Sequence, residues 1–164
     1  EDVFERLFGM PKAAAGFLLV TAALLLVAEY VGRRERPLTT VSWYDAILVG
    51  LAQALAIAPG ISRSGSTIAA GMLLGFNRED AARFSFFLAV PIMIGSGAYQ
   101  VYKLASGAAV AAAPALIVLG VVSAAVSGYL SIAGLMALVR RQRLVGFAVY
   151  CALLGTLVLT GVLG

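Results

Sequence analysis

The stretch Pro59-Gly60-Ile61-Ser62-Arg63-Ser64-Gly65-Ser66-Thr67 interrupts an otherwise apolar segment that runs from Ala46 to Phe76. Its apolar halves, about 46–58 and 65–76, contain 12–13 residues each, and as helices each reaches only about 18–20 Å. A bilayer core is about 30 Å thick, so neither half crosses it alone. The segment is therefore either one kinked spanning helix or a re-entrant hairpin that returns to the side from which it entered.

The positions of Lys and Arg favour the hairpin. Cytoplasmic loops of membrane proteins carry an excess of basic residues, so the arrangement with the greater asymmetry is preferred. A re-entrant hairpin places eight basic residues on one side and three on the other, whereas a spanning helix gives four against seven. We therefore expect a re-entrant hairpin over about residues 43–76, with its open end in the cytoplasm and the C-terminus outside.

Composition indicates that the solvent of this chain is lipid. Of its 164 residues, 62% are hydrophobic and 12% are charged, against about 25% charged residues in soluble domains. Further apolar runs cover about residues 13–31, 84–102, 108–139 and 144–164. The predicted fold class is all-α: one polytopic integral membrane domain, 1–164, with about four spanning helices plus one re-entrant helix-loop-helix. Basic residues lie in short clusters between apolar runs, which is typical of membrane orientation and not of nucleic-acid binding.

Two helix starts can be read from the sequence. The stretch Ser42-Trp43-Tyr44-Asp45 has the form of a capping box, with a hydroxyl at the cap and a carboxylate three residues later. The stretch Asn77-Arg78-Glu79-Asp80 plays the same part before the next run, just after a predicted helix stop at Gly75. Glu29 falls near the end of the first run, and we expect its side chain to reach the membrane interface.

Arg63 is the only charged residue between Asp45 and Arg78. An isolated charge at membrane depth costs at least about 2.5–3.5 kcal/mol, so something must compensate it. One interpretation is structural: the guanidinium pairs with backbone carbonyls or with a carboxylate of another helix. The other is that Arg63 binds an anion.

The surroundings of Arg63 favour the anion site. Gly60 and Gly65 permit a tight irregular turn, and the helix that begins at about Gly65 directs free N–H groups and its positive dipole end into that turn. Together with a guanidinium and hydroxyls, such a helix start binds phosphate well. Four hydroxyls lie within six residues of one another: Ser62, Ser64, Ser66 and Thr67.

Two further residue classes bear on the site. Gln53, about two turns before Pro59, either lines the cavity or makes an interhelical hydrogen bond. The chain has no histidine, and no cluster of carboxylates is near Arg63 in the sequence. Hydrolysis of a diphosphate usually requires a divalent metal or a general base. Because the sequence offers neither a histidine nor a carboxylate cluster near Arg63, no metal ligands are predicted in this chain.

The motif resembles the undecaprenyl-diphosphate phosphatase family of the bacitracin-resistance type. The matching sequence reads GLAQALAIAPGISRSGSTI over residues 50–68, GMLLG over 71–75 and RFSFFLAVP over 83–91. Its PGxSRSGxT core is highly specific to that family. The apolar runs also fit, so the resemblance covers essentially the whole chain as the C-terminal part of a family member.

The resemblance implies an integral membrane enzyme that hydrolyses undecaprenyl diphosphate to the monophosphate and recycles the lipid carrier of peptidoglycan synthesis. Family members are inverted repeats with two re-entrant hairpins, use a divalent cation (Mg or Ca), and lie in the bacterial plasma membrane. A polyprenyl diphosphate and a second copy of the chain are the expected partners. By position, we expect Arg63, Ser62 and Thr67 to be catalytic, and Gly60, Ser64, Gly65, Ser66 and Gln53 to bind the diphosphate.

The second motif of the family, a glutamate pair followed by a serine-rich turn and a histidine, belongs to the N-terminal repeat and does not occur in this sequence. We therefore expect the chain to be one half of an inverted repeat, inactive alone, with the metal ligands and any serine nucleophile in the other half. The alternative function is a transporter or flippase for an anionic, phosphorylated substrate, because broken half-helices also bind ions in transporters. The third possibility is a membrane scaffold in which Arg63 has only a structural role.

Overall fold

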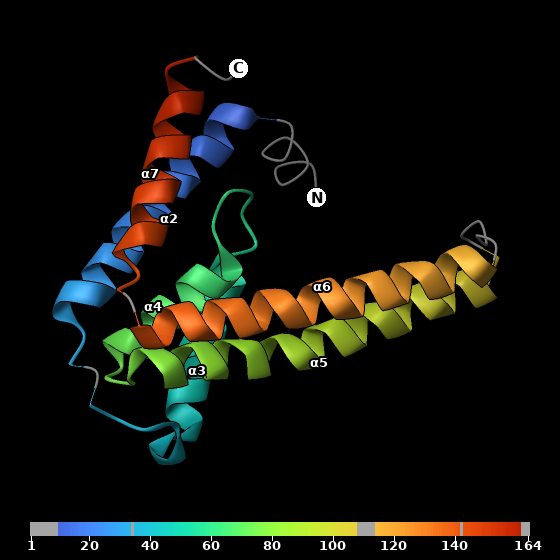
Figure 1. The fold of residues 1–164 in the computed structure, drawn as a ribbon, viewed down its shortest axis with the longest axis horizontal. Helices are drawn as coiled ribbons and strands as arrows, with labels where there is room; N and C mark the ends of the chain where they lie inside the picture. Colours follow the sequence, from blue (N-terminus) through green and yellow to red (C-terminus); the bar gives the residue numbers. More distant parts are fainter. Residues whose placement is uncertain (1–9, 34, 108–113, 142, 162–164) are drawn as a thin grey trace.

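The computed structural model describes residues 10–33, 35–107, 114–141 and 143–161. The predicted all-α class is confirmed for these residues, which contain no strand beyond an isolated bridge between Arg36 and Phe76. The elements are α2 (Pro11–Val31), η1 (Leu38–Thr40), α3 (Trp43–Leu55), α4 (Arg63–Leu73), α5 (Arg78–Ala105), α6 (Pro114–Arg141) and α7 (Val145–Leu159) (Figure 1).

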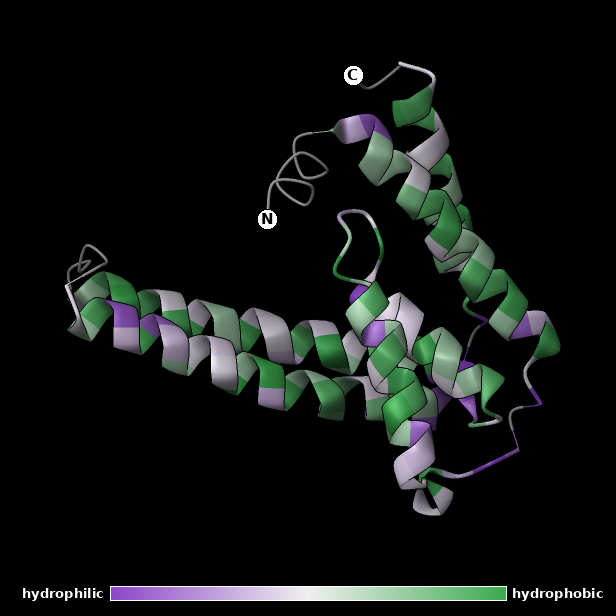
Figure 2. Ribbon diagram, turned by 180° about the vertical axis from the view of Figure 1, so that it is seen from behind, coloured by the Kyte–Doolittle hydropathy of each residue, from purple (hydrophilic) through white to green (hydrophobic). Residues whose placement is uncertain are grey.

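Three of these helices, α2, α5 and α6, are long and apolar enough to cross a membrane. The last predicted span, about residues 144–164, corresponds to α7, which has 15 residues and is about 22 Å long, shorter than a bilayer core. Residues 108–113, at the start of the apolar run predicted over 108–139, lie outside the described part. Hydrophobic residues cover the long helices along most of their length (Figure 2). The chain is therefore a polytopic membrane protein.

The helices form two antiparallel pairs with a short hairpin between them. Helix α7 packs along α2, closely enough that a Cβ atom on Gly155 would lie 2.8 Å from the carbonyl oxygen of Ala15. Helices α5 and α6 form the second pair, which runs across the direction of the first (Figure 1). Helix α4 contacts α2, α3 and α5, so it holds the central position in the fold.

The connection after α2 closes the open end of the α3–α4 hairpin. The backbone N–H of Arg36 donates to the carbonyl of Gly75 at 2.9 Å, and the N–H of Asn77 donates to the carbonyl of Arg36 at 3.1 Å. The Arg36 side chain donates to Asp45 on α3 and to the carbonyl of Leu74 after α4. The segment thus returns to the end of α2 from which it started. A re-entrant interpretation requires this geometry, and the position of the hairpin in a bilayer stays a prediction.

Both predicted caps are present. The Ser42 hydroxyl accepts from the N–H of Asp45 at 3.2 Å while the Asp45 carboxylate accepts from the N–H of Ser42 at 2.8 Å. The Asn77 side chain accepts from the N–H of Asp80 at 2.9 Å. Gly75 follows α4 with φ = +96°, a conformation that glycine adopts without steric cost. Local sequence therefore determines where α3, α4 and α5 begin or end.

The expected position of Glu29 is wrong. Its side chain does not extend outward from the protein but is buried inside it: Glu29 is 2% exposed and forms an ion pair with Arg78 at the start of α5. The two residues are 49 positions apart, and only the folded chain brings them together. Burial of an isolated carboxylate costs much more free energy than burial of one that is paired and hydrogen-bonded.

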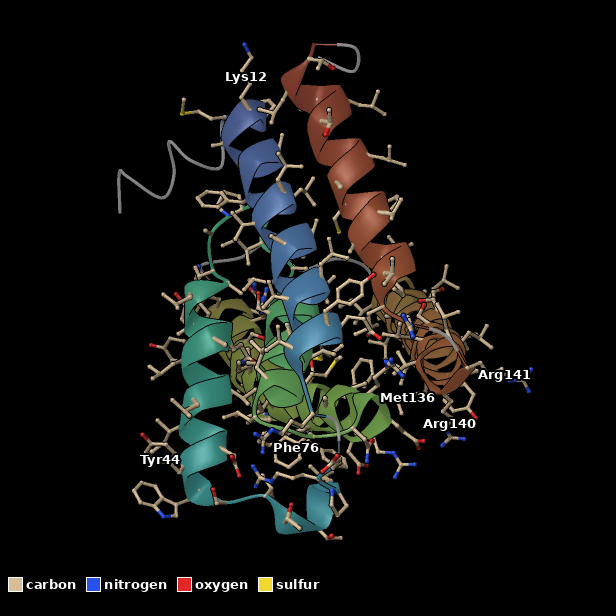
Figure 3. The ribbon with its side chains drawn as sticks, turned by 90° about the vertical axis from the view of Figure 1, so that its left-hand side faces the viewer. Lys12, Tyr44, Phe76, Met136, Arg140 and Arg141 are labelled. Carbon is tan, nitrogen blue, oxygen red and sulfur yellow. The ribbon has the colours of Figure 1, made fainter. Side chains whose placement is uncertain are left out.

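Basic side chains gather toward one end of the molecule. Lys12 lies at the start of α2, whereas Phe76 lies beside its far end, and Arg140 and Arg141 are on the Phe76 side (Figure 3). Arg140 donates to Glu79 at 2.7 Å, which connects the end of α6 to the start of α5. The side of the membrane on which this end lies stays a prediction.

Candidate active site

The turn between α3 and α4 packs against α2. Gly60 has φ = +93°, and a Cβ atom there would lie 2.1 Å from the carbonyl oxygen of Ala14. The next contact is a hydrogen bond, in which the N–H of Ser62 donates to the hydroxyl of Thr21 at 3.1 Å. Since both contacts fix the turn on α2, they also fix where α4 begins.

Helix α4 begins at Arg63, two residues earlier than the sequence predicted, because Ser62 acts as its cap. The Ser62 hydroxyl accepts from the N–H of Gly65 at 3.1 Å, and its carbonyl accepts from the N–H of Ser66 at 2.8 Å. Ser62 was predicted to be catalytic; in the structure its oxygen is engaged in the cap, and it does not line the cavity at Arg63. It shapes the turn, and its catalytic role stays a prediction.

Arg63 faces a cavity of about 270 Å³ between α3, α4 and α5. Among the described residues, its side chain has no hydrogen-bond or ion-pair partner, and the side chain is exposed. The structural interpretation, a guanidinium paired within the fold, is therefore not what the described part shows. The cavity is lined by Gln53, Arg63, Ser64, Thr67, Ser85, Phe86, Ala89, Ile92 and Met93.

Four of the eight predicted site residues meet at this cavity: Gln53, Arg63, Ser64 and Thr67. Gly60, Ser62 and Gly65 shape the turn instead. A Cβ atom on Gly65 would lie 3.0 Å from the Ser62 hydroxyl and 3.2 Å from a methyl of Thr21, so the missing side chain lets α4 approach α2.

Ser66 lies on another face of α4. A helix turns by about 100° per residue, so Ser66 points about 100° away from Thr67. Ser66 lines a separate cavity of about 380 Å³, walled by apolar residues of α2, α3 and α4. Its hydroxyl is buried, with no hydrogen-bond partner in the described part of the chain. The structure thus places Ser66 away from the anion cavity to which the sequence assigned it.

Ser85 was not predicted to belong to the site. Its hydroxyl oxygen lies 2.6 Å from that of Thr67, and both residues line the Arg63 cavity. Ser85 is 4% and Thr67 is 1% exposed. A hydroxyl in the apolar run that follows the motif was the available signal, but sequence alone did not show that α5 packs on this face of α4.

The cavity has a positive electrostatic character. The first N–H groups of α4, those of Arg63 and Ser64, have no intrahelical acceptor, and they lie at the positive end of the helix dipole. No carboxylate lines the cavity. Among the described carboxylates, Glu29, Asp45 and Glu79 form ion pairs with arginines elsewhere. A phosphate or diphosphate is the ligand that such an arrangement favours.

The cavity does not by itself fit a divalent cation. In the residues that the structure describes, no group of three His, Cys, Asp or Glu side chains could hold a metal ion. The oxygens available at the cavity belong to one amide and three hydroxyls, whereas Mg²⁺ and Ca²⁺ are held mainly by carboxylates. The described residues at this cavity therefore do not form a metal site by themselves.

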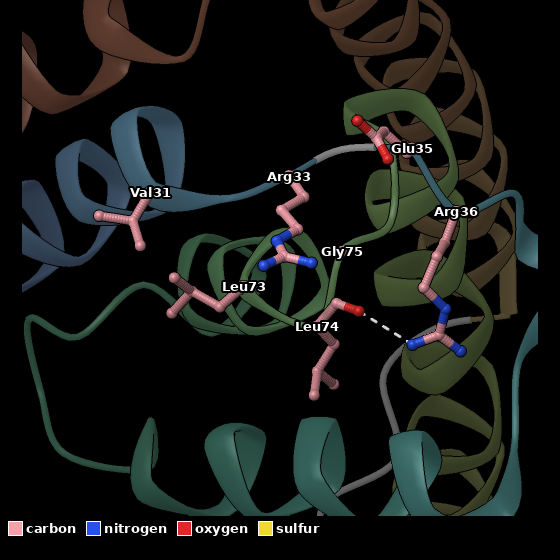
Figure 4. A pocket seen from close by; sticks show the side chains of 7 residues that line it. All are labelled: Val31, Arg33, Glu35, Arg36, Leu73, Leu74 and Gly75. Carbon is pink, nitrogen blue, oxygen red and sulfur yellow. Dashed lines mark hydrogen bonds between the residues drawn. The ribbon is translucent and has the colours of Figure 1, made fainter.

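A larger cavity, about 470 Å³, lies at the opposite end of α4. It includes Arg33, Glu35 and Arg36, and Figure 4 shows Arg36 donating to the carbonyl of Leu74. The Arg36 guanidinium already donates hydrogen bonds to the Asp45 carboxylate and to the carbonyls of Leu74 and Thr40, so it is not available to a ligand. The Arg36 side of this cavity therefore belongs to the structural closure of the hairpin.

Comparisons with known proteins agree with the geometry. The sequence profile of the family described as "Bacitracin resistance protein BacA" matches residues 1–157. A protein of Methanothermobacter thermautotrophicus named undecaprenyl-diphosphatase is 44% identical, with 99% of this chain and 91% of that protein aligned. Proteins of the same name from Halothermothrix orenii and Methanosphaera stadtmanae are 39% and 41% identical over 97% and 99% of this chain. The chain spans only 61% and 59% of those two relatives. It belongs to the BacA bacitracin-resistance family.

Proposed function

We propose that this chain carries the diphosphate-binding half of an undecaprenyl-diphosphate phosphatase. The observation that carries the proposal is the free guanidinium of Arg63 at the start of α4, facing a cavity without carboxylates. The names of the relatives supply the substrate: an undecaprenyl diphosphate, hydrolysed to the monophosphate and inorganic phosphate. Recycling of the lipid carrier for peptidoglycan synthesis, and resistance to bacitracin, follow from that reaction.

In this proposal, the residues at the cavity have distinct tasks. The Arg63 fork binds two non-bridging oxygens of the diphosphate, and the free N–H groups of Arg63 and Ser64 bind a third. Water attacks the terminal phosphorus, and the bond from that phosphorus to the bridging oxygen breaks. Negative charge moves onto the bridging oxygen as the bond breaks, and a guanidinium held in place stabilises it. Of the two protons of the attacking water, one stays on the inorganic phosphate and the other is released to solvent.

Three elements of the proposal come from the family and not from the described residues. A divalent cation, Mg or Ca, would neutralise the diphosphate, and its ligands must come from outside the Arg63 cavity. The protein would lie in the bacterial plasma membrane. The apolar stretch of α6 is not buried within the described chain. A homodimer would cover this exposed surface.

Phosphate release from undecaprenyl diphosphate by the full-length protein tests the proposal. The expected result is release of one phosphate per lipid, loss of activity with a chelator, and recovery with Mg²⁺ or Ca²⁺. Transport of a polyprenyl diphosphate across vesicles without phosphate release would instead support the transporter or flippase. Activity that is unchanged in both Arg63→Ala and Arg63→Lys would refute the role of the cavity.

A further inference from the structure

The hydroxyls of Thr67 and Ser85 form a directed chain. The Thr67 hydroxyl lies 3.0 Å from the carbonyl oxygen of Arg63 and 3.2 Å from that of Ser64, and it donates to them. A hydroxyl has one hydrogen, so Thr67 has none left for Ser85. The 2.6 Å contact between the two oxygens is therefore made by the hydrogen of Ser85, with Thr67 as the acceptor.

This chain crosses from one helix to another at the anion cavity. Ser85 stands on α5, Thr67 stands on α4, and the final acceptor is the carbonyl of the residue that carries the guanidinium. Ser85 and Thr67 are 4% and 1% exposed, so water does not compete for the bond between them. Hydrogen bonds in series strengthen one another in such surroundings.

We propose that Ser85 is a positioning residue: acting through Thr67, it holds the first turn of α4, and with it Arg63, in the orientation that stabilises the negative charge developing on the diphosphate as it is hydrolysed. Gly60 and Ser62 attach the turn to α2, whereas Ser85 attaches it to α5 from the opposite side. Without the Ser85 bond, α4 keeps its cap but can rotate or shift at its first turn. A displacement of about 1 Å at a catalytic group can cost about 100-fold in rate. The inference rests on the proposed phosphatase function.

The test compares Ser85→Ala with a matched serine on the same helix, Ser96→Ala. The Ser96 hydroxyl is exposed and donates only to the carbonyl of Met93 in its own helix, at 3.1 Å. For the full-length protein acting on undecaprenyl diphosphate, we expect Ser85→Ala to lower kcat about tenfold, with KM changed less than about twofold. Ser96→Ala should leave both constants unchanged. Ser85→Thr keeps the donor and should restore at least half of the lost rate.

A double-mutant cycle separates positioning through Thr67 from a general packing effect. If Ser85 acts through Thr67, then Ser85→Ala should cost less than about twofold in a Thr67→Val background. Full additivity of the two losses would overturn the inference, as would a Ser85→Ala variant that is as active as wild type. Rates are normalised to the amount of monodisperse protein. A Ser85→Ala loss that disappears after this normalisation reflects less folded enzyme and would also overturn the inference. A wild-type protein that releases no phosphate would instead refute the proposed function.

Discussion

Arg36 donates to both carboxylate oxygens of Asp45, at 3.2 and 2.9 Å, and to the carbonyl of Leu74 at 2.9 Å. One guanidinium therefore joins the first turn of α3 to the end of α4. These two points are the open ends of the hairpin whose tip carries Arg63. The closure at Arg36 and the anion cavity lie at opposite ends of α4, so the first keeps the second in place without taking part in binding.

The pH dependence of stability should report on this closure. Hydrogen bonds from Arg36, assisted by those from Ser42, lower the pKa of Asp45 from its ordinary 3.8 to about 2, although burial acts in the opposite direction. A lowered pKa in the folded state gives stability that is complete above about pH 4 and is lost as the pH falls toward about 2. We expect the Tm of the wild type to fall within that window, and that of Asp45→Asn to fall less. Equal slopes for the two proteins would contradict the closure.

The turn at Gly60 should tolerate no side chain. Gly60→Ala meets both a positive φ and the carbonyl oxygen of Ala14, and we expect it to destabilise the protein by at least about 2 kcal/mol. Gly97→Ala is the matched control, because a Cβ atom on that helical glycine has no neighbour within 4 Å. Its Tm should stay the same or rise, since alanine is preferred in helices. A similar Tm for both variants would show that the turn does not pack on α2 as described.

The fork of Arg63 should matter more than its charge. Lysine keeps the charge but loses the paired donors, so we expect Arg63→Lys to lower kcat/KM for undecaprenyl diphosphate about 100-fold. Arg63→Ala should lower it about 1,000-fold. Arg83→Lys serves as the control, because Arg83 is half exposed and pairs with Glu79 on its own helix; its activity should stay within about twofold. A lysine variant with full activity would mean that a point charge suffices.

Local patterns predicted most of the fold. The apolar runs predicted the helices. The caps Ser42 and Asn77 predicted the exact first residues of α3 and α5. The helix of Arg63 was placed two residues late, because four hydroxyls within six residues gave no reason to prefer Ser62 as the cap. Local sequence identifies which residues can cap a helix, and the contact of Ser62 with Thr21, 41 positions away, helps to select one.

Contacts between distant helices could not be predicted in the same way. Ser66 and Thr67 are adjacent hydroxyl residues, yet they face different cavities, since α4 packs with α2 and α3 on one face and α5 on another. Ser85 joined the site for the same reason. Sequence thus predicted an anion site at Arg63, whereas the packing around α4 decides which hydroxyls line the same cavity.

The buried pair of Glu29 and Arg78 should contribute more to stability than any surface pair in the described chain. Glu29 is 2% exposed and is the partner of Arg78 across α2 and α5. Glu29→Gln keeps the shape but leaves the guanidinium without its counter-charge, and loss of one partner of a buried pair costs about 3–5 kcal/mol. Unfolding followed by Tm or by denaturant in detergent would measure the loss.

Glu79→Gln provides the comparison, because Glu79 contacts two exposed arginines and is itself 31% exposed. Surface pairs contribute about 0–1 kcal/mol, and salt screens them. We expect Glu79→Gln to change stability by less than about 1 kcal/mol and to lose even that effect at high salt, whereas the Glu29→Gln loss should persist. If both variants respond alike, Glu29 reaches water, as its position near a helix end first suggested. If they differ as expected, the pair fixes α5 against α2 and thereby keeps Ser85 within reach of Thr67.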